Sequence, residues 1–313
     1  MSDPDIRQLI MGNPVARAFA ITGDAWTQLI MREAFYGVRR FGVWREKLGT
    51  PRSVLTDRLQ KMVAAGLLKQ EQIDTGLRTE YRLTEMGMDL FGVAVMQGQW
   101  ERHWARSPLQ ENYAIAYFDR TTDARIRLGV LTRPHGVEIT ADQVTWKAGK
   151  GIDLIIDPPT SRRRRSAPIE TDRPIIDRST DILGDYWSWA VLAATYFRLR
   201  KFDEIHAALG VATNILADRL SRLVLQGVLE KRPYQTAPLR YEYRLTESGR
   251  AMYPIFLAMH GWAVRWLVGK NEAPLTLVDR RDAEGFVPVV CDLTTGEPID
   301  PRQIRWELET TPA

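Results

Sequence analysis

The stretch FGVWREKLGTPRSVLTDRLQKMVAAG, residues 41–66, decides the fold because it predicts two short helices joined by a tight turn. The first helix is expected over residues 41–48 and ends at Gly49. Thr50 is expected to cap the second helix, with Pro51 at its first position, where the missing N–H of proline costs nothing. This second helix continues to the glycine that ends the stretch, with apolar side chains on one face and polar ones on the other. Such a pair is typical of a helix-turn-helix.

Segments on both sides of this stretch complete a winged unit. Before it, apolar residues at helical spacing follow Asp24, a good N-cap residue. After it, two runs of strand-forming residues flank an Asp-Thr-Gly turn, and Thr84 can cap a further helix. The expected elements are a helix over residues 25–36, wing strands over 67–73 and 79–83, and a long final helix from 85 to about 106.

The whole unit occurs twice, at an offset of about 161 residues. GDAW at 23–26 returns as GDYW at 184–187, and YRLTE at 81–85 returns unchanged at 243–247. A pair of tryptophans and a tail rich in strand formers follow in both copies, in the same order. The period is far too long for a solenoid repeat, so the chain contains two copies of one domain.

The second copy therefore repeats the elements of the first, with helices over 185–199, 201–209, 212–226 and 246–268 and a wing over 229–245. The predicted fold class is α+β, with two winged helix-turn-helix domains in tandem, each followed by a small β-rich tail. The expected boundaries are 1–106 for the first winged domain, 107–156 for its tail, 157–174 for a basic proline-containing linker, 175–270 for the second winged domain and 271–313 for its tail.

The linker carries two prolines followed by four arginines, Arg162 to Arg165. Two interpretations stay open for this run. It is either a strap that contacts DNA phosphates or a solvated connection without a partner.

An ordered set of short motifs recurs in both copies. It comprises Gly-Asp-x-Trp at 23 and 184, Arg/Lys-Phe at 40 and 201, Asp-Arg-Leu at 57 and 218, and the nearly gapless run from RPY at 232–234 to YEYRLTESG at 241–249. This set, found twice over roughly 85 to 90 residues, resembles the HxlR family of bacterial winged-helix regulators.

The resemblance implies DNA binding. Members of that family usually dimerise through their terminal helices to place two recognition helices on a palindromic site. Here it implies an intramolecular pseudo-dimer, with Trp100 and Trp104 near Trp262 and Trp266. The alternative is that each tryptophan pair belongs to the core of its own unit. Half-sites about one DNA turn apart, near 34 Å, are expected. Further homodimerisation through the tails is also open.

The polar outer faces of the two recognition helices and the wings supply the candidate DNA contacts. Arg52 is expected to reach a base or phosphate, because it lies at a helix N-terminus and has no packing role there. Arg58 and Arg219 either contact phosphates or pair with a carboxylate inside their own unit, and Asp24 and Asp185 are expected to be helix caps. The candidate DNA-binding residues are Arg52, Ser53, Thr56, Gln60, Lys61 and Arg78 in the first copy, and Thr213, Asn214, Ser221, Arg222, Lys231, Arg232 and Arg240 in the second.

The cysteine content departs from the family pattern. Several members sense oxidants through a cysteine just before the first helix, where this chain has Asn13-Pro14-Val15-Ala16 and Asp172-Arg173-Pro174, so thiol sensing there is excluded. Some relatives carry a C-terminal ribbon with paired cysteines, but Cys291 is the only cysteine here. A structural zinc site needs four nitrogen or sulfur ligands, so metal-free tails without a cofactor are expected.

Composition is that of a globular protein of about two domains, with 313 residues, 44% hydrophobic and 26% charged. A net charge of +4 is compatible with nucleic-acid binding. No apolar run approaches the roughly 18 residues of a membrane span, and the first ten residues lack a secretory signal pattern, so a cytoplasmic protein is expected. The four histidines are scattered and catalytic motifs are missing, so an enzyme is not expected.

The sequence thus predicts a sequence-specific regulator of transcription that binds double-stranded DNA at an imperfect palindrome, with repression as the expected mode and a small-molecule effector of unknown identity as a possible partner. The alternative is a winged-helix protein-interaction or ligand-sensing module with weak or no DNA binding. The acidic first wing, residues 70–74, keeps this alternative open. Two recognition helices that present positive or neutral faces on one side of the molecule, about one DNA turn apart, would favour DNA binding. Helices that point in opposite directions, or a helix that is covered, would favour the interaction module.

Overall fold

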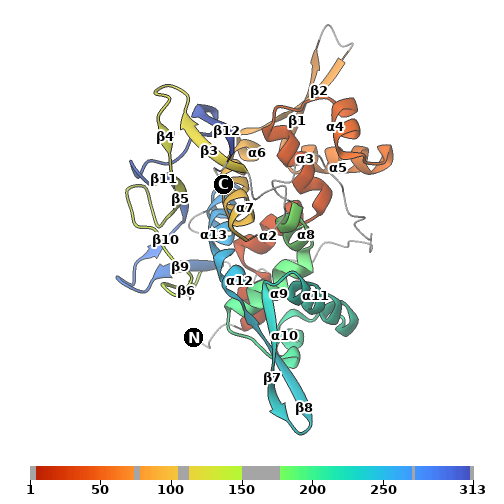
Figure 1. Ribbon diagram of the computed structural model, residues 1–313, viewed down its shortest axis with the longest axis vertical. Coiled ribbons are helices and arrows are strands. Elements are labelled where there is room, and N and C mark those ends of the chain that lie inside the picture. Colours follow the sequence, from red (N-terminus) through yellow and green to blue (C-terminus); the bar gives the residue numbers. More distant parts are fainter. Residues whose placement is uncertain (1–4, 74–77, 105–112, 150–176, 270–271, 311–313) are drawn as a thin grey trace.

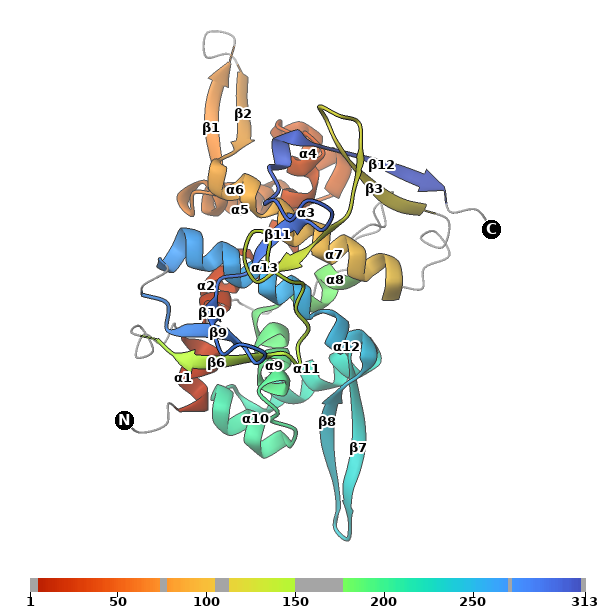
Figure 2. The ribbon, with the colours of Figure 1, turned by 90° about the vertical axis from the view of Figure 1, so that its left-hand side faces the viewer.

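The computed structural model describes residues 5–73, 78–104, 113–149, 177–269 and 272–310. Two helical units lie toward opposite ends of the long axis, and each extends a two-stranded wing away from the centre (Figure 1). The strands of both tails gather on one side of the molecule, where they face the viewer in Figure 2.

The first unit forms the predicted helix-turn-helix and wing. Its elements are α3 (Ala25–Phe35), α4 (Phe41–Leu48), α5 (Arg52–Ala64), β1 (Leu68–Ile73) and β2 (Arg78–Leu83). The two strands are antiparallel, with Leu68 opposite Leu83 and Ile73 opposite Arg78. Gly49 ends α4 with a φ of 59°, in the left-handed region that glycine tolerates best, and so turns the chain into α5.

The second unit repeats this arrangement. Its elements are α9 (Tyr186–Tyr196), α10 (Phe202–Leu209), α11 (Thr213–Leu225), β7 (Leu229–Thr236) and β8 (Leu239–Leu245). Gly210 ends α10 with a φ of 63°, as Gly49 does in the first unit. The prediction of two winged helix-turn-helix domains in tandem is confirmed.

The predicted start of the first recognition helix is wrong by one residue. Pro51, not Thr50, precedes the first turn of α5, and its side chain makes no capping hydrogen bond. Thr50 is 3% exposed, and its Oγ1 atom has no hydrogen-bond partner among the described residues. The side chain turns inward because the chain reverses tightly after Gly49, so it cannot reach the helix N-terminus.

The long final helix is also not continuous. In the first unit Thr84 accepts a hydrogen bond from the Gly87 N–H and caps α6 (Glu85–Asp89), and a break at Leu90 separates this turn from α7 (Phe91–Trp104). In the second unit Thr246 caps α12 (Glu247–Ala251), which is followed by α13 (Tyr253–Ala263) and a π-helical turn, Val264–Val268. Pro254 near the start of α13 lacks the N–H that an uninterrupted helix requires.

Three short helices that the sequence analysis missed connect the copies. They are α1 (Ile6–Met11), α2 (Pro14–Thr22) and α8 (Asp177–Leu183), where α2 and α8 occupy matching positions before the two Gly-Asp motifs. Helix α2 packs against α9 and α13 of the second copy, whereas α8 packs against α3 and α7 of the first. Each copy therefore receives a helix from the other.

The centre of this exchange is aromatic. Phe19 of α2 is 1% exposed and stacks on Trp189 of α9, with ring centroids 5.3 Å apart. Its ring centroid lies 6.4 Å from that of Phe256 in α13. In the opposite direction, the Gln28 side chain donates a 2.9 Å hydrogen bond to the carbonyl of Leu183 in α8. The two copies thus share one core.

Reciprocal polar contacts surround this core. The Trp100 indole N–H donates to the carbonyl of Ser248 at 2.9 Å, and the Trp262 indole N–H donates to the carbonyl of Met86 at the same distance. Both tryptophans therefore contact the opposite copy, and the interpretation that each serves only its own unit is wrong. A Cβ atom on Gly184 would lie 2.8 Å from the Cα atom of Ala25, so glycine is needed where the copies meet.

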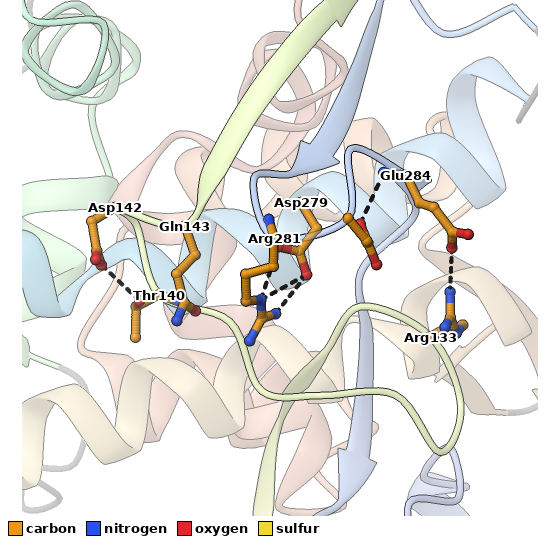
Figure 3. A network of polar contacts seen from close by, with 8 residues as sticks. Arg133, Thr140, Asp142, Gln143, Asp279, Arg281 and Glu284 are labelled. Carbon is orange, nitrogen blue, oxygen red and sulfur yellow. Dashed lines mark hydrogen bonds and ion pairs between the residues drawn. The ribbon is translucent and has the colours of Figure 1, made fainter.

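The two tails are β-rich, as predicted, but their strands are shared between the copies. The strands are β3 (Tyr113–Asp119), β4 (Arg125–Ile126), β5 (Leu128–Leu131), β6 (Val144–Ala148), β9 (Leu275–Asp279), β10 (Gly285–Phe286), β11 (Val289–Asp292) and β12 (Ile304–Thr310). Strand β3 pairs with β12, β5 with β11 and β6 with β9, always antiparallel. Figure 3 shows the region between them, where Arg133 of the first tail pairs with Glu284 of the second at 2.9 Å. The predicted linker and its four arginines lie outside the described residues.

The shared core predicts that the two copies unfold together. Replacing Phe19 with alanine should lower the free energy of unfolding by about 3–5 kcal/mol, because a buried phenylalanine is lost and a cavity remains. Urea denaturation followed by circular dichroism and by tryptophan fluorescence should show one transition at a lower midpoint. The exposed Val137→Ala, whose side chain is 51% exposed, is the control and should change little. Two separate transitions, only one of them shifted, would contradict a shared core.

Candidate nucleic-acid interface

The two recognition helices lie on the same side of the molecule, away from the tail strands (Figure 1). Their inner faces are anchored by buried side chains, Leu55, Leu59 and Met62 in α5 and Leu216, Leu220 and Leu223 in α11. Because these residues recur at helical spacing, the remaining face of each helix turns outward. A common, outward-facing side is one part of the arrangement that is expected of a DNA-binding protein.

The predicted residues of α5 lie on this outer face. Arg52, Ser53, Gln60 and Lys61 are exposed. Thr56 is half-buried, and its hydroxyl donates a 2.9 Å hydrogen bond to the Arg52 carbonyl. Lys61 pairs with Asp57 one turn earlier at 2.9 Å. Arg52 is the first residue of α5 and is the exposed cation at its N-terminus.

The predicted residues of α11 have the same placement but different chemistry. Thr213 and Asn214 are exposed at the first turn, and Ser221 and Arg222 are exposed farther along. Arg222 pairs with Asp218 at 3.0 Å, as Lys61 pairs with Asp57 in the first copy. The first turn of α11 therefore offers amide and hydroxyl groups where α5 offers a guanidinium group.

The wings carry the remaining predicted cations, and all of them are exposed: Arg78 on β2, and Lys231, Arg232 and Arg240 on β7 and β8. The Lys231 ammonium lies 4.1 Å from the ring centroid of Tyr241, and Arg232 pairs with Glu230 at 2.8 Å. These contacts hold the cations along the strands without burying their charge.

The described acidic side chains of the first wing are paired with cations, whereas Asp74, the other acid of residues 70–74, lies outside the described residues. Glu71 pairs with Lys69 at 2.6 Å and with Arg82 at 2.9 Å. The hydrogen bond from Lys69, together with the charges of Lys69 and Arg82, holds the pKa of the Glu71 carboxyl below its usual value. Glu80 is buried and pairs with Arg40 at 3.3 Å. The strands of this wing therefore present less negative charge than their sequence indicates.

Arg58 and Arg219 have the structural role that the sequence analysis left as one of two options. The Arg219 guanidinium donates two hydrogen bonds to Asp185, from Nε at 2.6 Å and from Nη2 at 2.8 Å. Burial opposes the charge on Arg219, but the hydrogen bonds and charge of Asp185 outweigh it and hold the pKa of the guanidinium above its usual value. In the first copy Arg58 lies 3.1 Å from Asp24.

Asp24 and Asp185 are helix caps, as predicted. Their side chains accept hydrogen bonds from the backbone N–H groups of Thr27 and Ser188, at the starts of α3 and α9. Each aspartate thus joins the first helix of its unit to the recognition helix. The backbones of the two aspartates also form an isolated antiparallel bridge across the junction of the copies.

Other exposed residues beside the predicted site were missed. Four exposed cations lie on α4 or just before it: Arg39, Arg40, Arg45 and Lys47. Three apolar side chains are exposed toward the tip of the second wing: Tyr234, Leu239 and Tyr241. The ring of Tyr234 is covered in part by the Lys201 ammonium, 5.0 Å from its centroid. The polar pattern of residues 39–47 could have predicted that the four cations are exposed. The exposure of the apolar side chains near the wing tip follows only from the fold.

Two helix-turn-helix units with exposed second helices and wings define a winged-helix protein of the class that binds DNA. The profile of the HxlR-like helix-turn-helix family matches residues 21–108 and again residues 182–271. These matches cover more than half of the chain, which therefore belongs to the HxlR family and contains its domain twice.

Relatives carry names that refer to transcription. Rv3095 of Mycobacterium tuberculosis, an uncharacterized HTH-type transcriptional regulator, is 38% identical over 152 residues, which are 48% of this chain and 95% of that protein. YvaP of Bacillus subtilis, also an uncharacterized HTH-type transcriptional regulator, is 33% identical over 95 residues, 30% of this chain and 88% of its own. The solved structure of PA1607, a candidate transcription factor, is 32% identical, covers 42% of this chain and 91% of its own, and has a TM-score of 0.38.

Among the described residues, no group of three or more histidine, cysteine, aspartate or glutamate side chains is placed to hold a metal ion. None of the described helices is long and apolar enough to cross a membrane.

The arginines of α11 should separate into structural and surface residues. Arg219→Ala should lower the free energy of unfolding by about 1.5–3 kcal/mol, the range for hydrogen bonds to charged groups, because it removes two bonds from a side chain that is 18% exposed. Arg222→Ala, the matched control with a side chain 57% exposed, should change it by less than about 1 kcal/mol. Urea denaturation at pH 7 measures both, and equal losses would show that Arg219 is no anchor.

Cys291 should be inert in the folded protein. The residue is fully buried, and burial, aided by the charges of Glu297 and Asp292, raises the pKa of its thiol to about 11. The reactive thiolate is therefore scarce at neutral pH. A thiol-specific disulfide reagent at pH 8 should label Cys291 only after denaturant is added. Rapid stoichiometric labelling of the native protein would contradict this assignment.

Proposed function

We propose that this chain is a sequence-specific regulator of transcription that binds double-stranded DNA in the cytoplasm through α5 and α11. The two units act as an intramolecular pseudo-dimer, so that a single polypeptide engages both halves of one operator. Family membership and the names of the relatives support a DNA-binding regulator. The pseudo-dimer, the operator symmetry and the mode of regulation are parts of this proposal.

The observation that carries the proposal is the common orientation of the recognition helices. Both have their apolar faces buried in their own units and their polar faces exposed, on the side of the molecule opposite the tails (Figure 1). A wing extends beyond each helix, as needed to reach the DNA flanking each half-site. Helix-turn-helix dimers use this geometry to occupy successive major grooves about 34 Å apart.

The two half-sites are expected to differ. Arginine forms paired hydrogen bonds to guanine, whereas asparagine forms them to adenine. Arg52 and Ser53 open α5, but Thr213 and Asn214 open α11. The operator is therefore an imperfect palindrome, with a guanine favoured where Arg52 reaches and an adenine where Asn214 reaches. Occupation of such a site within a promoter would repress transcription by excluding the polymerase.

The exposed apolar side chains of the second wing favour a second candidate function, protein interaction. Tyr234, Leu239 and Tyr241 are 39%, 57% and 37% exposed, and exposed apolar side chains that gather on one element can mark a protein-interaction site. They favour a protein-interaction role for this wing, either beside DNA binding or in its place. The following experiment separates the two functions.

DNA binding is tested with purified protein and two duplex pools, the intergenic DNA upstream of its own gene and a random library carried through selection. Fluorescence anisotropy across a salt series should give an affinity whose logarithm falls linearly and steeply with the logarithm of salt concentration, because bound lysine and arginine displace counterions. One chain should bind each operator. Arg52→Ala should weaken specific binding by about 1–3 kcal/mol and relax the preference at one guanine.

Arg125→Ala is the matched control, because Arg125 is an exposed arginine on β4, among the tail strands. It should leave the affinity and the base preference unchanged. Equal effects of the two substitutions, or binding that is equally weak on every duplex, would reject sequence-specific reading and leave the protein-interaction function. A stoichiometry of two chains per operator would reject the pseudo-dimer while keeping the DNA reader.

A further inference from the structure

A pocket of about 370 Å³ lies in the second copy, between its helical unit and the shared tail strands. Its walls come from α9 and α13, from β6 and β9, and from the α1–α2 segment of the first copy. Figure 2 shows β6 and β9 crossing beside α9 and α1. The volume falls within the range of small-molecule sites, roughly 300–1,000 Å³.

The pocket is lined by aromatic rings. The rings come from both copies and are those of Trp146, Trp189, Tyr196, Phe197, Tyr253 and Phe256. Several already contact one another with the tilted or edge-to-face geometry that aromatic pairs favour, such as Trp146 with Phe197 at 6.0 Å and Tyr196 with Tyr253 at 5.1 Å. A planar ring placed among them would gain the same contacts.

The charged side chains of the pocket lining have one sign. Arg198 and Arg280 are exposed residues that line it, beside the uncharged Asn13 and Thr145, and no aspartate or glutamate of the described residues does so. The Arg280 Nε atom donates to the Val144 carbonyl at 3.1 Å, which fixes the guanidinium while its two terminal nitrogens remain unbonded among the described residues. An anionic group would find a pre-positioned partner here.

His260 is the buried polar group of the pocket. Its side chain is only 3% exposed, and none of the described residues forms a hydrogen bond with its ring. Burial lowers the pKa of the imidazole to about 4, so the ring is neutral at pH 7 and has one donor and one acceptor available. Buried polar groups are normally hydrogen-bonded, which the described residues do not provide for this ring.

The first copy has different side chains at positions that line the pocket in the second. At the position of Leu277 it has Tyr117, which is 8% exposed, and at the position of His260 it has Gly98. The Tyr117 hydroxyl lies 3.9 Å from where a Cβ atom on Gly98 would be, so the phenol occupies the room that a histidine would need. At the position of Ala193, which lines the pocket, the first copy has the buried Arg32. Smaller side chains at two positions thus accompany the open space in the second copy.

We propose that this pocket is a binding site for a small aromatic carboxylate, with the ring between the aromatic side chains, the carboxylate at Arg280 and a hydrogen bond from His260 to a polar substituent. The site also couples to the recognition helix. Binding itself is independent of the proposed function, whereas this regulatory role rests on it.

Two physical connections lead from the pocket to α11. Ile6 of α1 lines the pocket. The guanidinium of the next residue, Arg7, lies against the turn between α10 and α11, where its Nη1 atom is 2.6 Å from the position that a Cβ atom on Gly210 would take. On the other side, α9 lines the pocket and is capped by Asp185, which holds Arg219 of α11. A ligand that shifts α1 or α9 therefore shifts the element proposed to read DNA.

Ligand binding is measured first without DNA, on the full chain. The probe is 2-naphthoate, and the controls are the neutral 2-naphthamide and the non-aromatic cyclohexanecarboxylate. Calorimetry and tryptophan fluorescence measure the binding of each compound. We expect saturable binding of 2-naphthoate at one site, at least tenfold tighter than either control. Arg280→Gln should remove the preference for the carboxylate over the amide. Equal binding of all three probes, or no binding of 2-naphthoate, would overturn the proposal.

A filled-pocket variant provides the test of location. The double substitution Leu277→Tyr with His260→Gly copies the pair found in the first copy, where this scaffold already accommodates it. It should fold, as judged by circular dichroism and its melting temperature, and bind 2-naphthoate at least tenfold more weakly. Tyr117→Phe in the first copy is the matched control and should bind normally. Unchanged binding by the folded double variant would place the ligand elsewhere and reject the site.

DNA affinity is then measured with and without saturating 2-naphthoate. We expect the ligand to change the DNA affinity at least threefold in the original protein and not at all in the double variant. Because coupling between two sites is reciprocal, DNA should change the affinity for 2-naphthoate by the same factor. Ligand binding without any specific DNA binding would reject the proposed function and keep the site. Specific DNA binding that ignores a bound ligand would reject the regulatory role alone.

Discussion

The burial of Phe19 against Trp189 and Phe256 joins the two copies, and the other contacts between them are arranged around it. The helix that carries Phe19, α2, belongs to the first copy but completes the core of the second. Conversely, α8 belongs to the second copy and packs against the first. Since neither helical unit buries its apolar surface fully without the other, the duplication yields one shared core. The indole hydrogen bonds of Trp100 and Trp262 to the opposite copy follow the same exchange.

A shared core has a direct consequence for recognition. Each recognition helix is tied to the first helix of its unit by an aspartate and an arginine, and the first turns of α3 and α9 meet at the bridge between Asp24 and Asp185. The spacing of α5 and α11 is therefore determined by packed helices and short ion pairs rather than by the long connection between the copies. Such a pair of helices is pre-organised, and pre-organisation reduces the entropic cost of binding.

Duplication within one chain also allows the copies to diverge. A symmetric dimer must use one sequence for both halves, but here arginine opens one recognition helix and threonine and asparagine open the other. The copies have also diverged at interior positions. Tyr117 packs beside Gly98 in the first copy, whereas Leu277 and His260, at the matching positions of the second copy, line a pocket. The two copies thus differ in the side chains at these matching positions.

The sequence by itself determined the features that depend on local periodicity and on capping chemistry. These include the helix-turn-helix, the wing, the duplication, the caps at Asp24 and Asp185 and the exposed face that carries Arg52, because helical spacing alone sorts side chains into inner and outer faces. It could not choose between the two roles of Arg219, since the partner Asp185 lies 34 residues earlier. Tertiary structure alone decided the exchange of α2 and α8, the pairing of strands between tails and the pocket beside His260. Each of these joins residues distant in sequence, and no local pattern specifies which apolar surface will cover which.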